Sequence, residues 1–120
     1  MPLRFVDFPS DPNSLKSVPG DYLVIYSSLT DGKLWCPDCV AVDDTVQSVF
    51  GNNDGPSALI VYVGQKADWK TPSNQFRGEP WKIQSVPTII RLRDDARLVD
   101  MDIIHRLHGF VEDGFNLTGN

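Results

Sequence analysis

The sequence has little that would place it at a membrane or on nucleic acid. No apolar run approaches the length of about eighteen residues that a transmembrane helix needs. Its 11 basic residues are scattered and outnumbered by 16 acidic ones, which argues against nucleic acid or an anionic membrane as the main partner. Residues 1–8 lack the apolar segment and the small-residue cleavage site of a secretory signal. We therefore expect a cytoplasmic location.

The sequence also lacks internal repeats, low-complexity tracts and linkers, and it has only two cysteines. We expect residues 1–120 to form a single monomeric domain with one hydrophobic core. Both cysteines fall within Trp35-Cys36-Pro37-Asp38-Cys39. This spacing permits either a dithiol or a disulfide that closes a very small, easily reduced ring. Since stable disulfides are rare in the cytosol, the pair is predicted to be catalytic or metal-binding.

The hydrophobic pattern predicts an α/β layer fold with a mixed sheet. Five segments have the composition of strands: 5–8, 22–27, 58–63, 88–92 and 97–100. A helix is predicted from Cys36 to about residue 50, and another from Asp102, which is expected to be its N-cap. Shorter helical pieces are expected at 14–18 and 73–77, with a turn at 9–13 and a loop at 28–34.

The position of the cysteines favours redox chemistry. Cys36 is expected where a loop gives way to a helix, so the free N–H groups of the first turn can stabilise an exposed thiolate. Pro37 suits the first helical turn because it has no N–H to leave unpaired there. Cys39 then lies one turn further on, within bonding distance and less exposed. Asp38 has two open roles: its charge is expected to raise the pKa of Cys36, or it carries protons for Cys39.

Zinc binding is the main alternative function for the cysteine pair. His105-x-x-His108 contains the only two histidines and would complete a four-ligand site with Cys36 and Cys39. The histidine spacing is shorter than usual, however, and both side chains are expected on one helix. We therefore predict no metal site. Taken alone, Pro87 before an apolar strand fits either an ordinary trans bond or a cis bond.

The arrangement resembles thioredoxin. A Trp-Cys-x-x-Cys motif lies between a buried strand and a helix, and Val86-Pro87-Thr88 leads a later strand. The resemblance implies a thioredoxin-like fold, with a central mixed sheet of four to five strands flanked by helices. It makes Cys36 the nucleophile and Cys39 the resolving thiol. It also makes Pro87 a cis-proline that faces the cysteines and, with Val86, contacts the substrate beside Trp35 and Pro37.

A narrower resemblance is to the fourteen-kilodalton thioredoxin-related proteins, the thioredoxin-domain-containing protein seventeen family. It rests on matches from about residue 22 to 99: Trp35 to Val40, Val63-Gly64, Trp69-Lys70, Pro72, Asn74, Phe76-Arg77, Val86-Pro87-Thr88 and Leu98-Val99. It implies a cytosolic thiol–disulfide oxidoreductase without a bound cofactor. Thioredoxin reductase would recharge it with electrons from NADPH, and it would prefer small disulfides such as cystine over many protein substrates of thioredoxin.

The sequence departs from these patterns at two places. Residues 22–28 contain no carboxylate, as in the narrower family, whereas thioredoxin has a buried aspartate there that assists proton transfer at the resolving cysteine. Asp38 or a water molecule is then the candidate proton acceptor. Asp43 and Asp44 stand where the narrower family usually has a helix proline. Without that proline the helix is expected to be straighter, and the two added charges near the site could disfavour acidic substrates or alter docking to thioredoxin reductase.

Residues 65–79 are the best candidate for a specificity surface, because loops carry function more often than cores do. Trp69 and Lys70 could form a wall beside the cysteines, or Trp69 could be half-buried for packing. A thioredoxin-fold binding or adaptor protein with an incidental cysteine pair is the remaining alternative function.

Overall fold

The computed structural model describes residues 3–7, 21–51, 56–78 and 81–118. A five-stranded mixed sheet forms its centre, in the order β1-β5-β2-β6-β7. The strands are β1 (Leu3–Asp7), β2 (Tyr22–Tyr26), β5 (Ala58–Tyr62), β6 (Thr88–Arg91) and β7 (Ala96–Val99). The first three run parallel, and β6 and β7 are antiparallel additions. The predicted fold class is confirmed; the turn expected at 9–13 and the helical turns at 14–18 lie outside the described residues.

The central strand β2 is buried along its whole length because its side chains are mostly apolar. Its sequence, Tyr-Leu-Val-Ile-Tyr, consists of aromatic, branched and β-branched residues, and all five side chains are buried. Such a continuous apolar run is typical of a strand covered on both faces. Val24 pairs with Ile60 on β5 and with Ile89 on β6. The C-terminal end of β2 is thereby fixed between two neighbouring strands.

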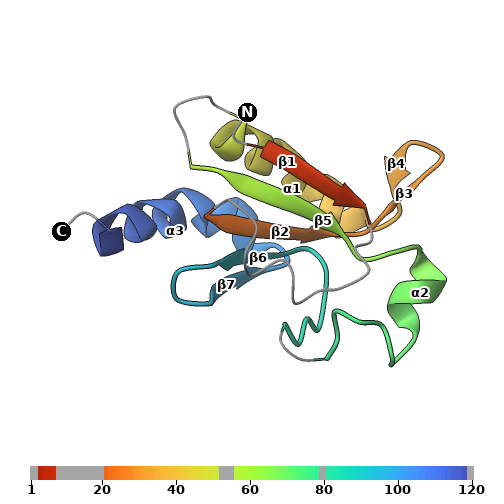
Figure 1. Cartoon of the computed structure of the whole chain (residues 1–120). Helices are drawn as coiled ribbons and strands as arrows, with labels where there is room; N and C mark the ends of the chain where they lie inside the picture. Colours follow the sequence, from red (N-terminus) through yellow and green to blue (C-terminus); the bar gives the residue numbers. More distant parts are fainter. Residues whose placement is uncertain (1–2, 8–20, 52–55, 79–80, 119–120) are drawn as a thin grey trace.

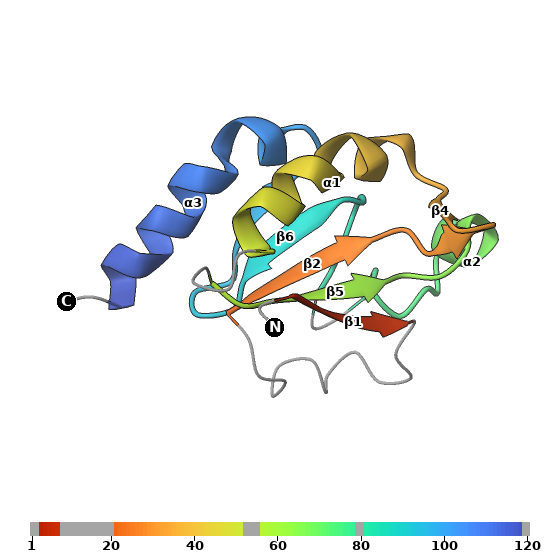
Figure 2. The same ribbon diagram turned by 90° about the horizontal axis from the view of Figure 1, so that it is seen from above.

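Two helices, α1 (Pro37–Phe50) and α3 (Asp102–Thr118), cover the same face of the sheet (Figures 1 and 2). The buried residues of α1 recur at helical spacing and form one apolar stripe: Cys39, Val42, Val46, Val49 and Phe50. The Phe50 and Tyr22 rings lie 5.3 Å apart between centroids, and Tyr22 also contacts Phe110 of α3 at 6.0 Å. Aromatic contacts therefore join both helices to β2.

The predicted loop at 28–34 is instead a small hairpin, with β3 (Leu29–Thr30) paired to β4 (Lys33–Leu34). Asp31 and Gly32 form its turn with φ of 53° and 83°. An Asp-Gly pair with two positive φ angles suits the twist of a tight hairpin. The sequence carried this signal, but the strands are too short to have a recognisable alternating pattern.

The short helix expected at 73–77 is also wrong, because α2 (Lys66–Lys70) lies earlier and residues 73–77 form turns. A capping box starts α2: the Gln65 amide donates to the Asp68 carboxylate at 3.0 Å, while the Gln65 side chain accepts in return. Asn74 instead closes a local turn, since its side-chain oxygen accepts the Phe76 amide at 2.9 Å. Figure 2 shows α2 beside the β3–β4 hairpin.

The remaining boundaries differ by only a few residues from the prediction. Asp102 is the first helical residue of α3 and not its N-cap. The turn before β7 places Asp95 in the left-handed region at φ 61°, where aspartate is tolerated better than most residues. No helix within the described ranges is long and apolar enough to cross a membrane.

Candidate functional site

Cys36 occupies the N-cap position of α1. Its backbone is extended, with φ −92° and ψ 116°, and Pro37 follows as the first helical residue. The Cys36 carbonyl accepts the Val40 amide at 3.2 Å, which closes the first helical turn. The thiol therefore lies at the positive end of the helix dipole, where a developing negative charge is favoured.

Both thiols are free, and both cysteines are buried. Cys39 is 0% exposed, as expected for the resolving position, whereas Cys36 is only 8% exposed. The expectation that Cys36 is openly exposed is therefore wrong. The Cys36 thiol donates a hydrogen bond to the Val86 carbonyl at 3.6 Å and so faces the segment before Pro87.

The segment around Pro87 forms the opposite wall of the site. The peptide bond between Val86 and Pro87 is cis, the geometry that the resemblance implies for it. Two hydrogen bonds hold the segment: the Thr88 hydroxyl donates to the Ser85 carbonyl at 2.8 Å, and the Asp100 amide donates to the Pro87 carbonyl at 2.9 Å. Residues far apart in the sequence thus converge on the Cys36 sulfur.

Trp35 is half-buried, and its hydrogen bonds position the start of the cysteine motif. Its indole N–H donates to the Gly64 carbonyl at 2.9 Å, and its amide donates to the Ser28 carbonyl at 3.4 Å. The Ser28 hydroxyl in turn accepts the Gly64 amide at 2.9 Å. These contacts tie the start of the cysteine motif to the ends of β2 and β5. Trp35 therefore fixes the start of the motif in place.

Ser27 is a site residue that the sequence prediction missed. It follows β2 directly, is 0% exposed, and its hydroxyl accepts the Cys36 amide at 3.3 Å. Burial raises the pKa of the Cys39 thiol, and the neighbouring Ser27 opposes part of that rise. The only signal in the sequence was a polar residue ending a strongly apolar run.

The carboxylates of the motif region point in different directions. Asp38 is exposed, together with Pro37, at the start of α1. Asp43 instead reaches the interface between α1 and the sheet, where the buried Tyr26 hydroxyl donates to it at 3.1 Å. Burial raises the pKa of Tyr26, and the Asp43 charge raises it further. Tyr26 therefore stays protonated and keeps this hydrogen bond.

Asp100 adds a further negative charge near Pro87. Burial raises the pKa of its carboxyl, a hydrogen bond from Ser85 opposes that change, and the charges of Asp38 and Asp102 add to the rise. Its backbone is left-handed at φ 55°. Asp38, two residues after Cys36, and Asp100, beside Pro87, thus bring two acidic groups close enough for their charges to interact.

Trp69 and Lys70 lie in the last turn of α2. Trp69 is buried at 6% exposure, and the Arg77 guanidinium stacks over its ring at 4.0 Å. Arg77 also donates to the Trp69 carbonyl at 2.7 Å. These contacts support the packing interpretation of Trp69, with deeper burial than expected. Lys70 is exposed.

The four residues of the zinc alternative do not form a site. Cys36 and Cys39 are buried, while His105 and His108 are exposed on α3. Across the described ranges, no three His, Cys, Asp or Glu side chains are grouped so that they could hold a metal ion. This geometry is contrary to a Cys₂His₂ zinc module.

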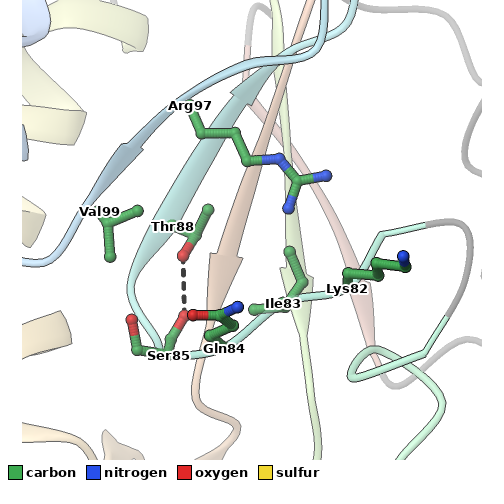
Figure 3. Close-up of a pocket in the computed structure, with 7 residues that line it drawn as sticks. All are labelled: Lys82, Ile83, Gln84, Ser85, Thr88, Arg97 and Val99. Carbon is green, nitrogen blue, oxygen red and sulfur yellow. Dashed lines mark hydrogen bonds between the residues drawn. The ribbon is translucent and has the colours of Figure 1, made fainter.

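A pocket of about 250 Å³ adjoins the segment that leads to Pro87 (Figure 3). Its lining comes from residues 82–85 and from β6 and β7, and comprises Lys82, Ile83, Gln84, Ser85, Thr88, Arg97 and Val99. Figure 3 shows the Arg97 side chain extending along one wall. An exposed ion pair of 3.3 Å joins Arg97 to Asp95. The pocket therefore combines apolar surface with two basic residues, Lys82 and Arg97.

The fold and the site define a thioredoxin-like protein. A mixed sheet carries two helices on one face, and a Cys-x-x-Cys pair at the start of one helix meets a cis-proline at the start of a strand. More narrowly, residues 10–115 match the family model described as "Thioredoxin domain-containing protein 17-like, thioredoxin domain". The chain belongs to this family.

Curated proteins of the same family resemble the chain over part of their length. Thioredoxin domain-containing protein 17 of Homo sapiens is 34% identical over 74 residues, covering 61% of this chain and 59% of that protein. The Mus musculus protein of that name is 35% identical over 75 residues, with the same coverage. Thioredoxin-like protein Clot of Arabidopsis thaliana is 32% identical over 69 residues, covering 56% and 52%. The chain thus spans between about half and three-fifths of these relatives.

Proposed function

We propose that the chain is a thiol–disulfide oxidoreductase whose Cys36–Cys39 pair cycles between a dithiol and a disulfide. The observation that carries this proposal is the contact of the Cys36 sulfur with the Val86 carbonyl beside the cis-proline, at the start of α1. A nucleophilic thiol at a helix N-terminus, with a second thiol one turn away, is the arrangement that disulfide exchange requires. Membership of a thioredoxin-domain family supports the same reaction.

The reaction proceeds in two exchanges. The Cys36 thiolate attacks one sulfur of the substrate disulfide, forms a mixed disulfide and releases the first substrate thiolate. Cys39 then loses its proton and attacks the Cys36 sulfur, which releases the second substrate thiolate. The substrate gains two electrons, the cysteine pair loses two, and each released thiolate takes up a proton. The hydrogen bond between the Cys36 thiol and the Val86 carbonyl must break when the substrate approaches.

Small disulfides such as cystine are the proposed substrates. The pocket next to Val86 supports this choice, because its volume suits an amino-acid-sized group and Arg97 can pair with a carboxylate. The acidic groups near Cys36 would bind an ammonium group of the same substrate. The proposed cycle needs no bound cofactor or metal. Thioredoxin reductase would restore the dithiol with electrons from NADPH, acting on a monomer in the cytoplasm.

The test of this proposal is NADPH consumption by thioredoxin reductase in the presence of the chain and either cystine or insulin. We expect turnover that depends on the chain with cystine, and much less with insulin, because a buried Cys36 and a small pocket favour small disulfides. Cys36→Ser is the control and should give only the rate of the reductase alone. No turnover with either substrate would overturn the proposal and favour the binding or adaptor alternative.

The charge of Asp38 is proposed to select among disulfide substrates. Asp38→Asn should raise the rate for the anionic glutathione disulfide, relative to the cationic dimethyl ester of cystine, by about threefold at low salt. A unit charge a few ångströms from the substrate contributes on the order of 1 kcal/mol in water, before screening. Asp44→Asn, an exposed change further along α1, is the matched control. An unchanged ratio in Asp38→Asn would contradict this role.

A further inference from the structure

Asp100 lies at the turn between β7 and α3, next to the segment that contains Val86 and Pro87. Its backbone is left-handed at φ 55°, a conformation that aspartate adopts more readily than most residues. The Asp100 amide donates to the Pro87 carbonyl at 2.9 Å. This hydrogen bond holds the segment on the C-terminal side of Val86.

The side chain of Asp100 holds the same segment on the other side of Val86. The Ser85 hydroxyl donates to Asp100 Oδ2 at 3.4 Å. The Ser85 carbonyl in turn accepts the Thr88 hydroxyl at 2.8 Å, which closes a short turn around Val86 and Pro87. Asp100 thus bonds to both chain neighbours of Val86, once through its carboxylate and once through its backbone amide.

Val86 faces the nucleophile from within this turn. Its carbonyl accepts the Cys36 thiol at 3.6 Å, and the residue is only 7% exposed. A disulfide that reaches the Cys36 sulfur must break this contact and pack against the same segment. Ordering a backbone segment costs free energy at every encounter with a ligand, and a segment that is already fixed avoids that cost.

We propose that Asp100 is a positioning residue that holds the Val86 carbonyl against the Cys36 sulfur and so prepares the surface on which a disulfide substrate docks. The inference rests on the proposed oxidoreductase function and concerns its first exchange. In that step the Cys36 thiolate attacks one substrate sulfur, the substrate S–S bond breaks, and one substrate thiolate leaves. In the second exchange Cys39 attacks the Cys36 sulfur. Both cysteines lie at the start of α1, so α1 mainly sets the geometry of that step.

Asp95 provides a comparison that separates positioning from ordinary turn formation. It is also left-handed, at φ 61°, and it lies just before the opposite end of β7. Its carboxylate pairs with Arg97 at 3.3 Å, and its amide donates to the Arg91 carbonyl at 2.8 Å. Asp95→Gly therefore changes a left-handed aspartate beside the same strand but leaves the contacts of Asp100 intact.

The test measures the two exchanges of a single turnover separately. Reduced protein is mixed with an excess of an uncharged, symmetrical aromatic disulfide that releases one coloured thiol at each exchange. At disulfide concentrations that make the first exchange the faster one, we expect two phases of equal amplitude in the wild type. Asp100→Gly permits the left-handed backbone but removes the carboxylate. It should slow the first phase by about tenfold, the effect of losing one hydrogen bond to a charged group, and leave the second within about twofold.

Two further variants identify the hydrogen bond as the cause. Asp100→Asn keeps an oxygen that can accept the Ser85 proton and tolerates the left-handed backbone, so its first phase should stay within about threefold of the wild-type rate. Ser85→Ala removes the same bond from its other side and should slow the first phase as Asp100→Gly does. The double variant should be no slower than Asp100→Gly alone, because both changes remove one interaction. The uncharged disulfide makes these rates insensitive to the lost charge.

The outcomes separate failure of this inference from failure of the proposed function. If the wild type releases no thiol, the oxidoreductase proposal fails and this inference falls with it. If the wild type shows both phases, the role of Asp100 is overturned by an unchanged first phase in Asp100→Gly or by an equal slowing in Asp95→Gly. Equal slowing of both phases in Asp100→Gly also overturns it, since that result indicates a displaced cysteine motif. Chemical denaturation checks that each variant is folded, and Ser85→Ala decides the question if Asp100→Gly is not.

Discussion

Cys39→Ser should convert the chain from a catalyst into a trap, with half of the substrate left covalently attached to Cys36. The serine cannot resolve the mixed disulfide, so multiple turnover should fall at least about 10³-fold, as is common when one member of a catalytic unit is removed. Intact-protein mass spectrometry after mixing with cystine would show one added half-cystine. The adduct should disappear on treatment with a strong reductant.

Cys36→Ser is the companion variant for this experiment. Cys39 is 0% exposed, so it should not react with the substrate by itself, and no adduct is expected. An adduct on Cys39 in Cys36→Ser would reverse the assigned roles. Wild-type turnover by Cys39→Ser, with nothing trapped, would refute the two-cysteine mechanism altogether.

The reduced protein should lose stability in alkali because of Cys39. Burial raises the pKa of this thiol above its ordinary value of 9.0, so the folded state keeps the proton after the unfolded state has lost it. The stabilising contribution is fully present below pH 9 and is lost as the pH rises from there toward the folded pKa. The expected loss is about 1.4 kcal/mol in the free energy of unfolding for each pH unit above 9.

Denaturant titrations of the reduced wild type and of Cys39→Ser, at several pH values between about 8 and 11, would measure this loss. All other side chains are the same in both proteins, so the difference between the two curves isolates Cys39. A difference that stays constant with pH would show that Cys39 ionises as easily in the folded state as in the unfolded one.

The sequence predicted those parts of the molecule whose signal is local and repeated. The apolar run 22–27 identified the central strand, and the spacing of Val42, Val46 and Val49 identified α1. Pro37 after Cys36 marked the start of α1. These features follow from strand and helix periodicity, which tertiary contacts reinforce here.

The parts that could not be predicted depend on contacts between distant residues. The Cys36 thiol bonds to the Val86 carbonyl, 50 positions away in the chain, and no pattern near Cys36 indicates this contact. In the sequence, Asp43 only replaces the helix proline of the family. In the structure, its carboxylate accepts a hydrogen bond from the Tyr26 hydroxyl of β2. In the sequence, Ser27 is only the polar residue that ends an apolar strand, whereas in the structure its hydroxyl accepts a hydrogen bond from the Cys36 amide. A hydrogen bond between two individual polar groups produces no periodic pattern in the sequence.

Anchoring the redox pair to the end of β2 has a consequence for local opening. The strand lies between β5 and β6 at the centre of the sheet, and its residues are among the last to lose protection when a domain fluctuates. The β3–β4 hairpin and α2, in contrast, lie at one end of the sheet (Figure 2). The periphery of the protein can therefore loosen while the end of β2 beside the redox pair stays in place. Exposure of Cys39 to solvent would then require α1 to separate from the sheet, because this residue belongs to the buried stripe of that helix.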